Sequence, residues 1–140
     1  MGNNKITLKE AERFHGHLGP YLVLGLLAGE IALKKLRCRK YFSLKVRVWG
    51  ATKKPKSCLI DGLQLSTGST YGKGNIKKLN GRKIKIDFCN LANHKKIILK
   101  LKDNFIQRLQ RTKTHKDSGL LAKQLYNKDP LELFTLTTHY

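Results

Sequence analysis

The sequence predicts an α+β fold in which an antiparallel sheet packs against a long apolar central helix and shorter helices. Two patterns carry this prediction. Three segments alternate apolar and polar residues with period two, as half-buried strands do. One segment is apolar nearly all round, as expected for a helix that is covered on several sides. Because 140 residues are enough for one ordinary core and too few for two, we expect residues 1–140 to form a single domain.

The first helix signals lie near the N-terminus. Residues 7–10, Thr-Leu-Lys-Glu, have the form of a capping box, in which a hydroxyl and a carboxylate satisfy free amides at a helix start. A helix is therefore expected over residues 8–14. Proline suits the first position of a helix, so we expect the apolar helix to run from Pro20 to about Leu36. Two more helices are expected near residues 103–111 and 118–126.

The apolar helix contains two glycines, Gly25 and Gly29, one turn apart. Glycines allow another backbone to approach closely, and such a face could also form the seam of a homodimer. The alternative is that both glycines are merely tolerated in the helix. The sequence alone leaves both interpretations open.

The alternating segments predict strands around residues 44–49, 83–88 and 97–102. A fourth strand is expected over residues 75–79, followed by a hairpin, because Asn80-Gly81 is a strong turn signal. The sheet should have an aliphatic face, covered by the apolar helix, and a basic face. The basic face would carry Lys45, Arg47, Lys83, Lys85, Lys100 and Lys102, together with Trp49.

The chain is strongly basic, with 29 Lys and Arg against 9 Asp and Glu and a formal net charge of +20. Because 40% of its residues are hydrophobic, it is not a disordered polycation. The excess charge lies within residues 31–120, so it belongs to the folded unit. This balance favours an anionic partner: a nucleic acid, an acidic protein or an anionic small molecule. The alternative is a solvated lysine-rich surface.

Cysteine usage and hydropathy indicate the cellular compartment. Cys38, Cys58 and Cys89 are odd in number and irregular in spacing, which excludes a disulfide framework and a zinc finger built on paired CxxC. A reducing, cytoplasmic location is expected. The N-terminus lacks the apolar run of a secretion signal. The longest mostly apolar stretch, residues 18–29, is far shorter than the roughly 20 residues that cross a bilayer, so no membrane association is expected.

The first chemically distinctive segment is residues 14–20, FHGHLGP. His15 and His17 cannot share a helix face, but in an extended or turn conformation both imidazoles can project to one side. Gly16 removes the steric obstacle to that geometry. A His-x-His pair is a weak metal signal by itself. In the alternative, one histidine caps or packs and the other is solvated.

The second segment begins at Cys58. Ser57 is a good N-cap residue, so the thiol falls in the first turn of a predicted helix. The positive end of the helix dipole and the lysines within residues 53–56 would lower the thiol pKa. Asp61 lies one turn further on, so a catalytic role would fall to Cys58 and Asp61 facing one cleft. The alternative is that Cys58 is a small buried hydrophobe.

The third segment, residues 67–75, is TGSTYGKGN. It is not a P-loop, because only three residues separate Gly68 from Gly72 and Gly74 follows Lys73. It could still expose backbone N–H groups in a concave nest that binds an anion, with Lys73 supplying charge. A purely structural turn is the alternative. The candidate ligand-binding residues are Gln64, Thr67, Gly68, Thr70, Gly72, Lys73, Gly74 and Asn75.

Together the three segments resemble the core domain of the formylmethanofuran dehydrogenase FmdE family. Residues 14–20 with Leu24-Gly25 look like the N-terminal motif of the family. Residues 58–75, in the pattern CxxDGxQxxTGSTxGKGN, look like its central motif, and Leu133-Phe134 is similar to the place where the family core closes. The resemblance covers roughly residues 8–136.

The resemblance implies an α+β core, often dimeric, whose characteristic His and Cys residues gather in a metal-binding or active site. Carried over to this chain, the metal ligands are His15, His17 and Cys58, and the pocket is lined by Asp61, Gln64, Thr67 and Lys73. A thiolate with imidazoles suits Zn²⁺ first and Fe²⁺ second, and three protein ligands leave one position open.

The resemblance also implies a role in molybdenum or tungsten redox metabolism, including methanogenesis-related metabolism, in archaea and anaerobic bacteria. The chain would be an accessory protein of such a dehydrogenase or a metal-dependent enzyme, and no residue pair identifies a reaction. Many relatives carry cysteine where this chain has Gly19 and Ser69, which disfavours a thiol-based redox role. No CxxC pairs follow the core, so the zinc finger of some members is expected to be absent.

Two functions of different classes therefore remain. The first is an FmdE-like metal-binding protein with a His/Cys site beside a Gly-rich ligand loop. The alternative is a basic nucleic-acid-binding module that uses the Lys- and Arg-lined sheet face, with Trp49 available for stacking.

Overall fold

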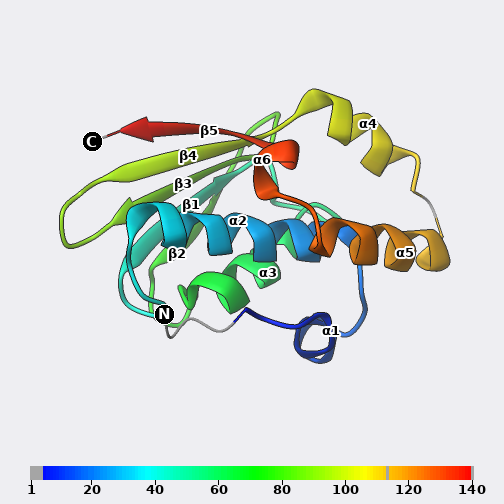
Figure 1. The fold of residues 1–140 in the computed structure, drawn as a ribbon, viewed down its shortest axis with the longest axis horizontal. Helices are drawn as coiled ribbons and strands as arrows, with labels where there is room; N and C mark the ends of the chain where they lie inside the picture. The colour runs from blue at the N-terminus through cyan, green and yellow to red at the C-terminus, as the bar shows by residue number, and fades with distance from the viewer. Residues whose placement is uncertain (1–4, 113, 140) are drawn as a thin grey trace.

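The computed structural model describes residues 5–112 and 114–139 (Figure 1). It confirms the α+β class. The helices are α1 (Leu8–His15), α2 (Pro20–Leu36), α3 (Cys58–Thr67), α4 (Asp103–Gln110), α5 (His115–Tyr126) and α6 (Pro130–Leu133). The strands are β1 (Leu44–Trp49), β2 (Ile76–Leu79), β3 (Lys85–Asn90), β4 (Lys96–Leu101) and β5 (Phe134–His139).

The first two helices follow their local signals. The Thr7 hydroxyl accepts from the Glu10 amide, and the Glu10 carboxylate accepts from the Thr7 amide, so the predicted capping box is confirmed. The helix α1 runs one residue further than predicted, to His15, and ends at Gly16 in the left-handed region. The helix α2 has the predicted bounds and is buried on nearly all sides. No described helix is both long and apolar enough to span a membrane.

The five strands form one mixed sheet in the order β2-β1-β3-β4-β5. The pairs β1·β3 and β3·β4 are antiparallel, as predicted, and so is the pair of β4 with the unpredicted strand β5. The pair β1·β2 is parallel, which departs from the predicted antiparallel sheet. The predicted hairpin at Asn80-Gly81 is wrong, because β1 lies between β2 and β3. Residues 80–84 instead cross the end of β1, so closely that a Cβ atom on Gly50 would lie 2.3 Å from the Lys83 carbonyl oxygen.

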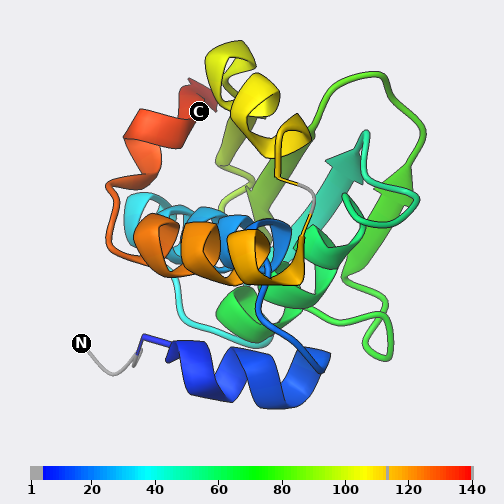
Figure 2. The same cartoon turned by 90° about the vertical axis from the view of Figure 1, so that its right-hand side faces the viewer.

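The sheet has two different faces. Leu44, Val46 and Val48 of β1 are buried, whereas the alternate residues of that strand are exposed or half-buried. Figures 1 and 2 show the helices gathered on one side of the sheet, with α2 against α3 and α5. The predicted aliphatic face is therefore the covered one. No described helix lies over the opposite face.

Candidate functional site

A direct side-chain contact joins α1 to α3 at the candidate site. His15 is the last residue of α1, and Asp61 lies in the first turn of α3. The Nδ1 atom of His15 lies 2.6 Å from Oδ2 of Asp61, with the His15 side chain only 10% exposed. An ionised carboxylate only accepts hydrogen bonds, so Nδ1 is the donor in this contact. The Nε2 atom is then the ring nitrogen left to bind a metal or a proton.

Two further imidazoles extend this contact. The left-handed turn at Gly16 brings the His17 ring to 4.9 Å from the His15 ring, measured between centroids. The His17 ring also meets the His115 ring edge-on at 5.5 Å. His115 is the first residue of α5. Sequence reasoning missed His115, because it lies outside all three motifs and only the packing of α5 brings it to this site.

Cys58 occupies the first position of α3, as predicted, but its environment differs from the prediction. The side chain is half-buried and packs against the main core. Burial raises the pKa of the Cys58 thiol, the Asp61 carboxylate raises it further, and Lys54 opposes both. The predicted lowering of the thiol pKa is therefore wrong.

The helix start explains this correction. The amides of Cys58, Leu59 and Ile60 donate to the carbonyls of Pro55, Lys56 and Ser57, respectively. The Ser57 side chain makes no capping hydrogen bond, because its own backbone is already helical. The first amides of α3 are thus bonded to the preceding turn, and the backbone hydrogen bond of Cys58 lowers the thiol pKa by less than burial raises it.

The predicted metal ligands are brought together only in part. His15 and His17 lie side by side, and Cys58 lies one turn before the aspartate that holds His15. Within residues 5–112 and 114–139, no group of three or more His, Cys, Asp or Glu side chains is arranged to hold a metal ion. The donor types fit a divalent metal, because they include an imidazole oriented by a carboxylate, a second imidazole and a thiol. Metal binding stays a prediction.

The glycine-rich loop is a structured turn. The amide of Thr70 donates to the Asn75 side chain, and the amide of Tyr71 donates to the Gln64 side chain. The amide of Lys73 donates to the Thr70 hydroxyl. These three N–H groups are satisfied by side chains of the loop and of Gln64 in α3, which favours the structural turn over an open backbone nest at these positions. Ligand binding by the loop's side chains stays a prediction.

The loop also lies at the other end of α3 from the histidines. Gly68 caps the C-terminus of α3, and its amide donates to the Gln64 carbonyl. The ten residues of α3 span about 15 Å at 1.5 Å per residue. Asp61, which holds His15, lies seven residues before Gly68, or about 10 Å along the helix axis. A metal site beside the loop stays a prediction.

The loop instead contacts an exposed aromatic pair. The Nζ atom of Lys73 lies 4.5 Å from the ring centroid of Phe42 and 5.4 Å from that of Tyr41. Ser69 is fully buried, and its hydroxyl donates to the Leu44 carbonyl. Asn75 donates from its side chain to the Tyr41 carbonyl. These bonds fix the loop against β1 and the segment that precedes it.

The fold and the site together define a class: an α+β domain whose mixed sheet is covered on one face by an apolar helix, with paired histidines held by an aspartate of the next helix. Residues 14–135 match the family model described as "FmdE, Molybdenum formylmethanofuran dehydrogenase operon". The chain belongs to the FmdE family.

Two known proteins are similar to it. The crystal structure of a tungsten formylmethanofuran dehydrogenase FmdE-like protein from Syntrophus aciditrophicus superimposes with a TM-score of 0.69 at 18% identity, covering 94% of this chain and 69% of that one. A "Probable S-adenosyl-L-methionine-binding protein" of Archaeoglobus fulgidus is 34% identical over an alignment of 76 residues that covers 52% of this chain. The match spans 21% of the length of that relative.

Proposed function

We propose that this FmdE-family chain binds a divalent metal ion, zinc or iron, through His15, His17 and Cys58. The observation that carries the proposal is the contact between His15 Nδ1 and Asp61 Oδ2 at 2.6 Å. Metal-binding histidines commonly donate their second ring nitrogen to a carboxylate, which fixes the tautomer and the ring orientation. In this interpretation Asp61 is a positioning residue and not a ligand.

The remaining donors support the proposal to different degrees. The His17 ring already lies beside the His15 ring, so its role requires the smaller rearrangement. Cys58 is half-buried with a raised thiol pKa, so a metal would have to displace its proton. A metal bound by three protein ligands would supply a Lewis acid with an open position for water or substrate.

Metal analysis of protein purified without a histidine tag tests the proposal. We expect one tightly bound ion per chain, or one that loads from added Zn²⁺ or Fe²⁺. The ion should be lost in His17→Ala and Cys58→Ala and kept in His139→Ala, which removes an exposed imidazole on β5. Protein that cannot be loaded with either metal overturns the proposal. Equal metal content in all three variants overturns the assignment of the ligands.

Cobalt substitution distinguishes the third ligand. If Cys58 coordinates, Co²⁺-loaded protein shows a sulfur-to-metal charge-transfer band that is absent in Cys58→Ala. If His115 takes that place, the band is missing in the parent protein, and His115→Ala loses the metal. The second outcome is a specific alternative, because the His115 ring already lies 5.5 Å from that of His17.

We infer further that the chain acts in the metabolism that its family name records, around formylmethanofuran dehydrogenases. The support is the match of residues 14–135 to the family. The test is association with a purified molybdenum or tungsten dehydrogenase of that type, measured by co-sedimentation with and without bound metal. A defined complex supports the inference, and separate sedimentation at micromolar concentrations of both proteins contradicts it.

A further inference from the structure

The outer face of the sheet, which we define as the face opposite α2, gathers basic side chains from three strands. The register places Trp49 of β1 opposite Lys85 of β3, and Lys85 opposite Lys100 of β4. Lys100 in turn lies opposite Thr135 of β5. Neighbouring strands are about 4.8 Å apart, so this row crosses most of the sheet within about 15 Å.

The row opens into a groove of about 510 Å³ at the end of the sheet. Lys83 and Lys102 border the same groove, so four lysines line it together with Trp49. Asp103 is the acidic residue in its lining, and it pairs with Lys83 at 3.2 Å while both side chains remain largely exposed. Exposed pairs of this kind contribute little and leave the lysine free to exchange partners. The groove is therefore strongly cationic.

The base of the Trp49 side chain lies against the backbone. A Cβ atom on Gly81 would lie 3.0 Å from Cβ of Trp49, because the crossing segment between β2 and β3 lies directly against it. The Lys85 ammonium lies 4.4 Å from the centroid of the indole ring, and the Arg47 guanidinium lies 5.3 Å away. The Lys85 side chain has no ion-pair partner among the described residues and can move to a phosphate, whereas Arg47 is held by its pair with Asp87.

The combination of four lysines with a half-buried indole favours one class of anionic partner. An acidic protein would satisfy the lysines but would leave the half-buried indole without a matching group. A single-stranded nucleic acid supplies both parts, because its bases stack on aromatic rings and its phosphates pair with lysines. Duplex DNA offers phosphates but keeps its bases stacked on one another.

We propose that the outer face of the sheet binds single-stranded nucleic acid, with a base stacked on Trp49 and phosphates on Lys83, Lys85, Lys100 and Lys102. This function is separate from the proposed metal site, which lies at α1, α3 and α5. It gives a role to part of the +20 net charge, which the metal site does not explain.

Trp49 is the single tryptophan of the chain, so its fluorescence reports on the groove directly. The probe is an unstructured RNA of about 15 nucleotides, within the site sizes of known single-strand binders. We expect it to bind and to quench the indole. Four phosphate contacts predict a slope of about −2.8 in log K against log salt, and hence about a 50-fold loss of affinity between about 50 and 200 mM salt.

Two kinds of variant locate the site. Trp49→Ala should weaken binding about 5- to 150-fold, the measured range for loss of one stacking platform, while Trp49→Phe should retain most of the affinity. The charge reversal Lys85→Glu with Lys100→Glu should weaken binding by about 10- to 100-fold at about 50 mM salt and make the salt slope shallower.

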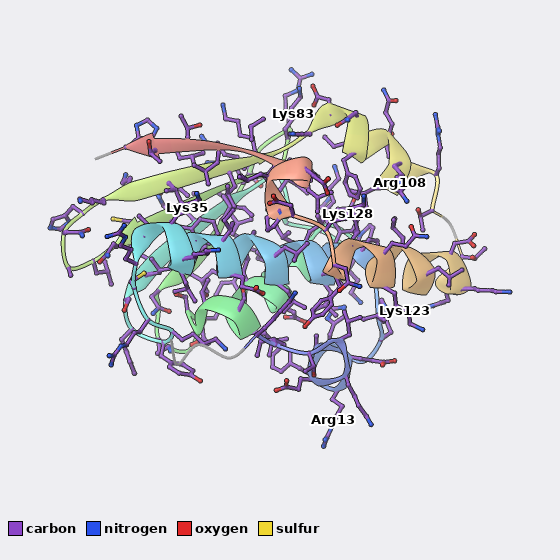
Figure 3. All side chains as sticks on the ribbon, viewed as in Figure 1. Arg13, Lys35, Lys83, Arg108, Lys123 and Lys128 are labelled. Atoms are coloured by element: carbon purple, nitrogen blue, oxygen red, sulfur yellow. The ribbon has the colours of Figure 1, made fainter. Side chains whose placement is uncertain are left out.

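The matched control for charge is Lys9→Glu with Lys123→Glu, which changes the net charge equally on α1 and α5. Figure 3 shows that basic side chains also project from the helical layer, with Lys123 labelled on α5. A general effect of charge would weaken binding equally in both double variants. If circular dichroism shows that both double variants are folded and both weaken binding equally, the proposal is overturned.

Two competing probes complete the test. Polyglutamate of similar length represents an acidic protein, and a duplex of the same sequence represents double-stranded nucleic acid. Tighter binding of either competitor than of the single strand, or binding of the RNA without quenching of Trp49, overturns the proposal. Preferential binding of the single strand with quenching supports it, and metal-free protein should behave identically because the metal site is not involved.

Discussion

Gly25 of α2 and Gly62 of α3 face each other where the two helices cross. A Cβ atom on Gly25 would lie 2.2 Å from the carbonyl oxygen of Leu59, and one on Gly62 would lie 2.1 Å from that of Leu22. Both obstructing atoms belong to backbones, which cannot move aside as a flexible side chain could. The close approach of another backbone is therefore confirmed for Gly25, with α3 as the partner, whereas Gly29 admits the Ser66 side chain of α3.

This crossing predicts a large loss of stability in Gly62→Ala. The added methyl group must push α3 away from α2, and we expect a loss of about 3 kcal/mol, the upper part of the range for overpacked cores. Chemical denaturation with unchanged m-value measures it. Gly119→Ala is the matched control, because Gly119 lies in α5 and a Cβ atom there meets nothing within 4 Å. That variant should gain about 0.5–1 kcal/mol from helix propensity.

The contact between His15 and Asp61 predicts a second effect if the metal is bound as proposed. Asp61→Asn retains the shape of the side chain but removes the charge that orients the imidazole. We expect metal affinity to fall about 10- to 100-fold, with little change in the folded state. Competition with a chelator of known affinity measures the loss. An unchanged affinity would show that Asp61 does not support a metal ligand.

The environment of Cys58 predicts slow reaction with alkylating reagents at neutral pH. Burial and Asp61 raise the thiol pKa, so at any pH below that pKa less thiolate is present than in an unfolded chain. The pH midpoint of alkylation should lie above that of an ordinary thiol. In Asp61→Asn the midpoint should move down, because a negative neighbour is removed. In Lys54→Met it should move up.

The measurement uses protein in which Cys38 and Cys89 are replaced by serine, so that one thiol remains. Alkylation is followed by mass spectrometry across the pH range in which the protein stays folded. A midpoint below the ordinary thiol value would contradict the structure and restore the activated thiol expected from the position of Cys58 at a helix start.

Local signals predicted local structure well and long-range pairing poorly. Pro20 and the apolar run fixed the bounds of α2, because helix starts depend on residues close in the chain. The Asn80-Gly81 signal failed because the position of β1 between β2 and β3 is decided by pairing across the whole sheet. The strand β5 was not predicted at all, since most of its residues are polar and only Phe134 in it is fully buried.

The candidate site, too, could be predicted from the sequence only in part. The motif around His15 and His17 allowed both imidazoles to project to one side, and the centroids of the two rings do lie 4.9 Å apart. It did not reveal that Asp61 bonds His15, because that contact depends on the crossing of α2 and α3, which places α3 beside α1. The thiol pKa was mispredicted because burial and the hydrogen bonds of the preceding turn are not visible in residue spacing.

Arg47 and Asp87 give the last prediction. They are directly paired across β1 and β3, and the Arg47 guanidinium donates to Oδ2 of Asp87. The Asp87 side chain is 6% exposed, and its Oδ1 atom has no hydrogen-bond partner among the described residues. Lys96 approaches Oδ2 to 3.8 Å from β4. The carboxylate therefore depends on two cations from neighbouring strands.

Removing one partner should expose the cost of this buried charge. We expect Arg47→Met to destabilise the fold by about 1–3 kcal/mol, because the carboxylate stays buried with a weaker partner. The double variant Arg47→Met with Asp87→Leu should recover much of that loss, since an apolar pair avoids the desolvation penalty. Lys83→Met, which breaks the exposed pair with Asp103, should cost less than about 1 kcal/mol. Equal losses in Arg47→Met and Lys83→Met, measured by urea denaturation, would show that the burial of Asp87 adds nothing to its pairing.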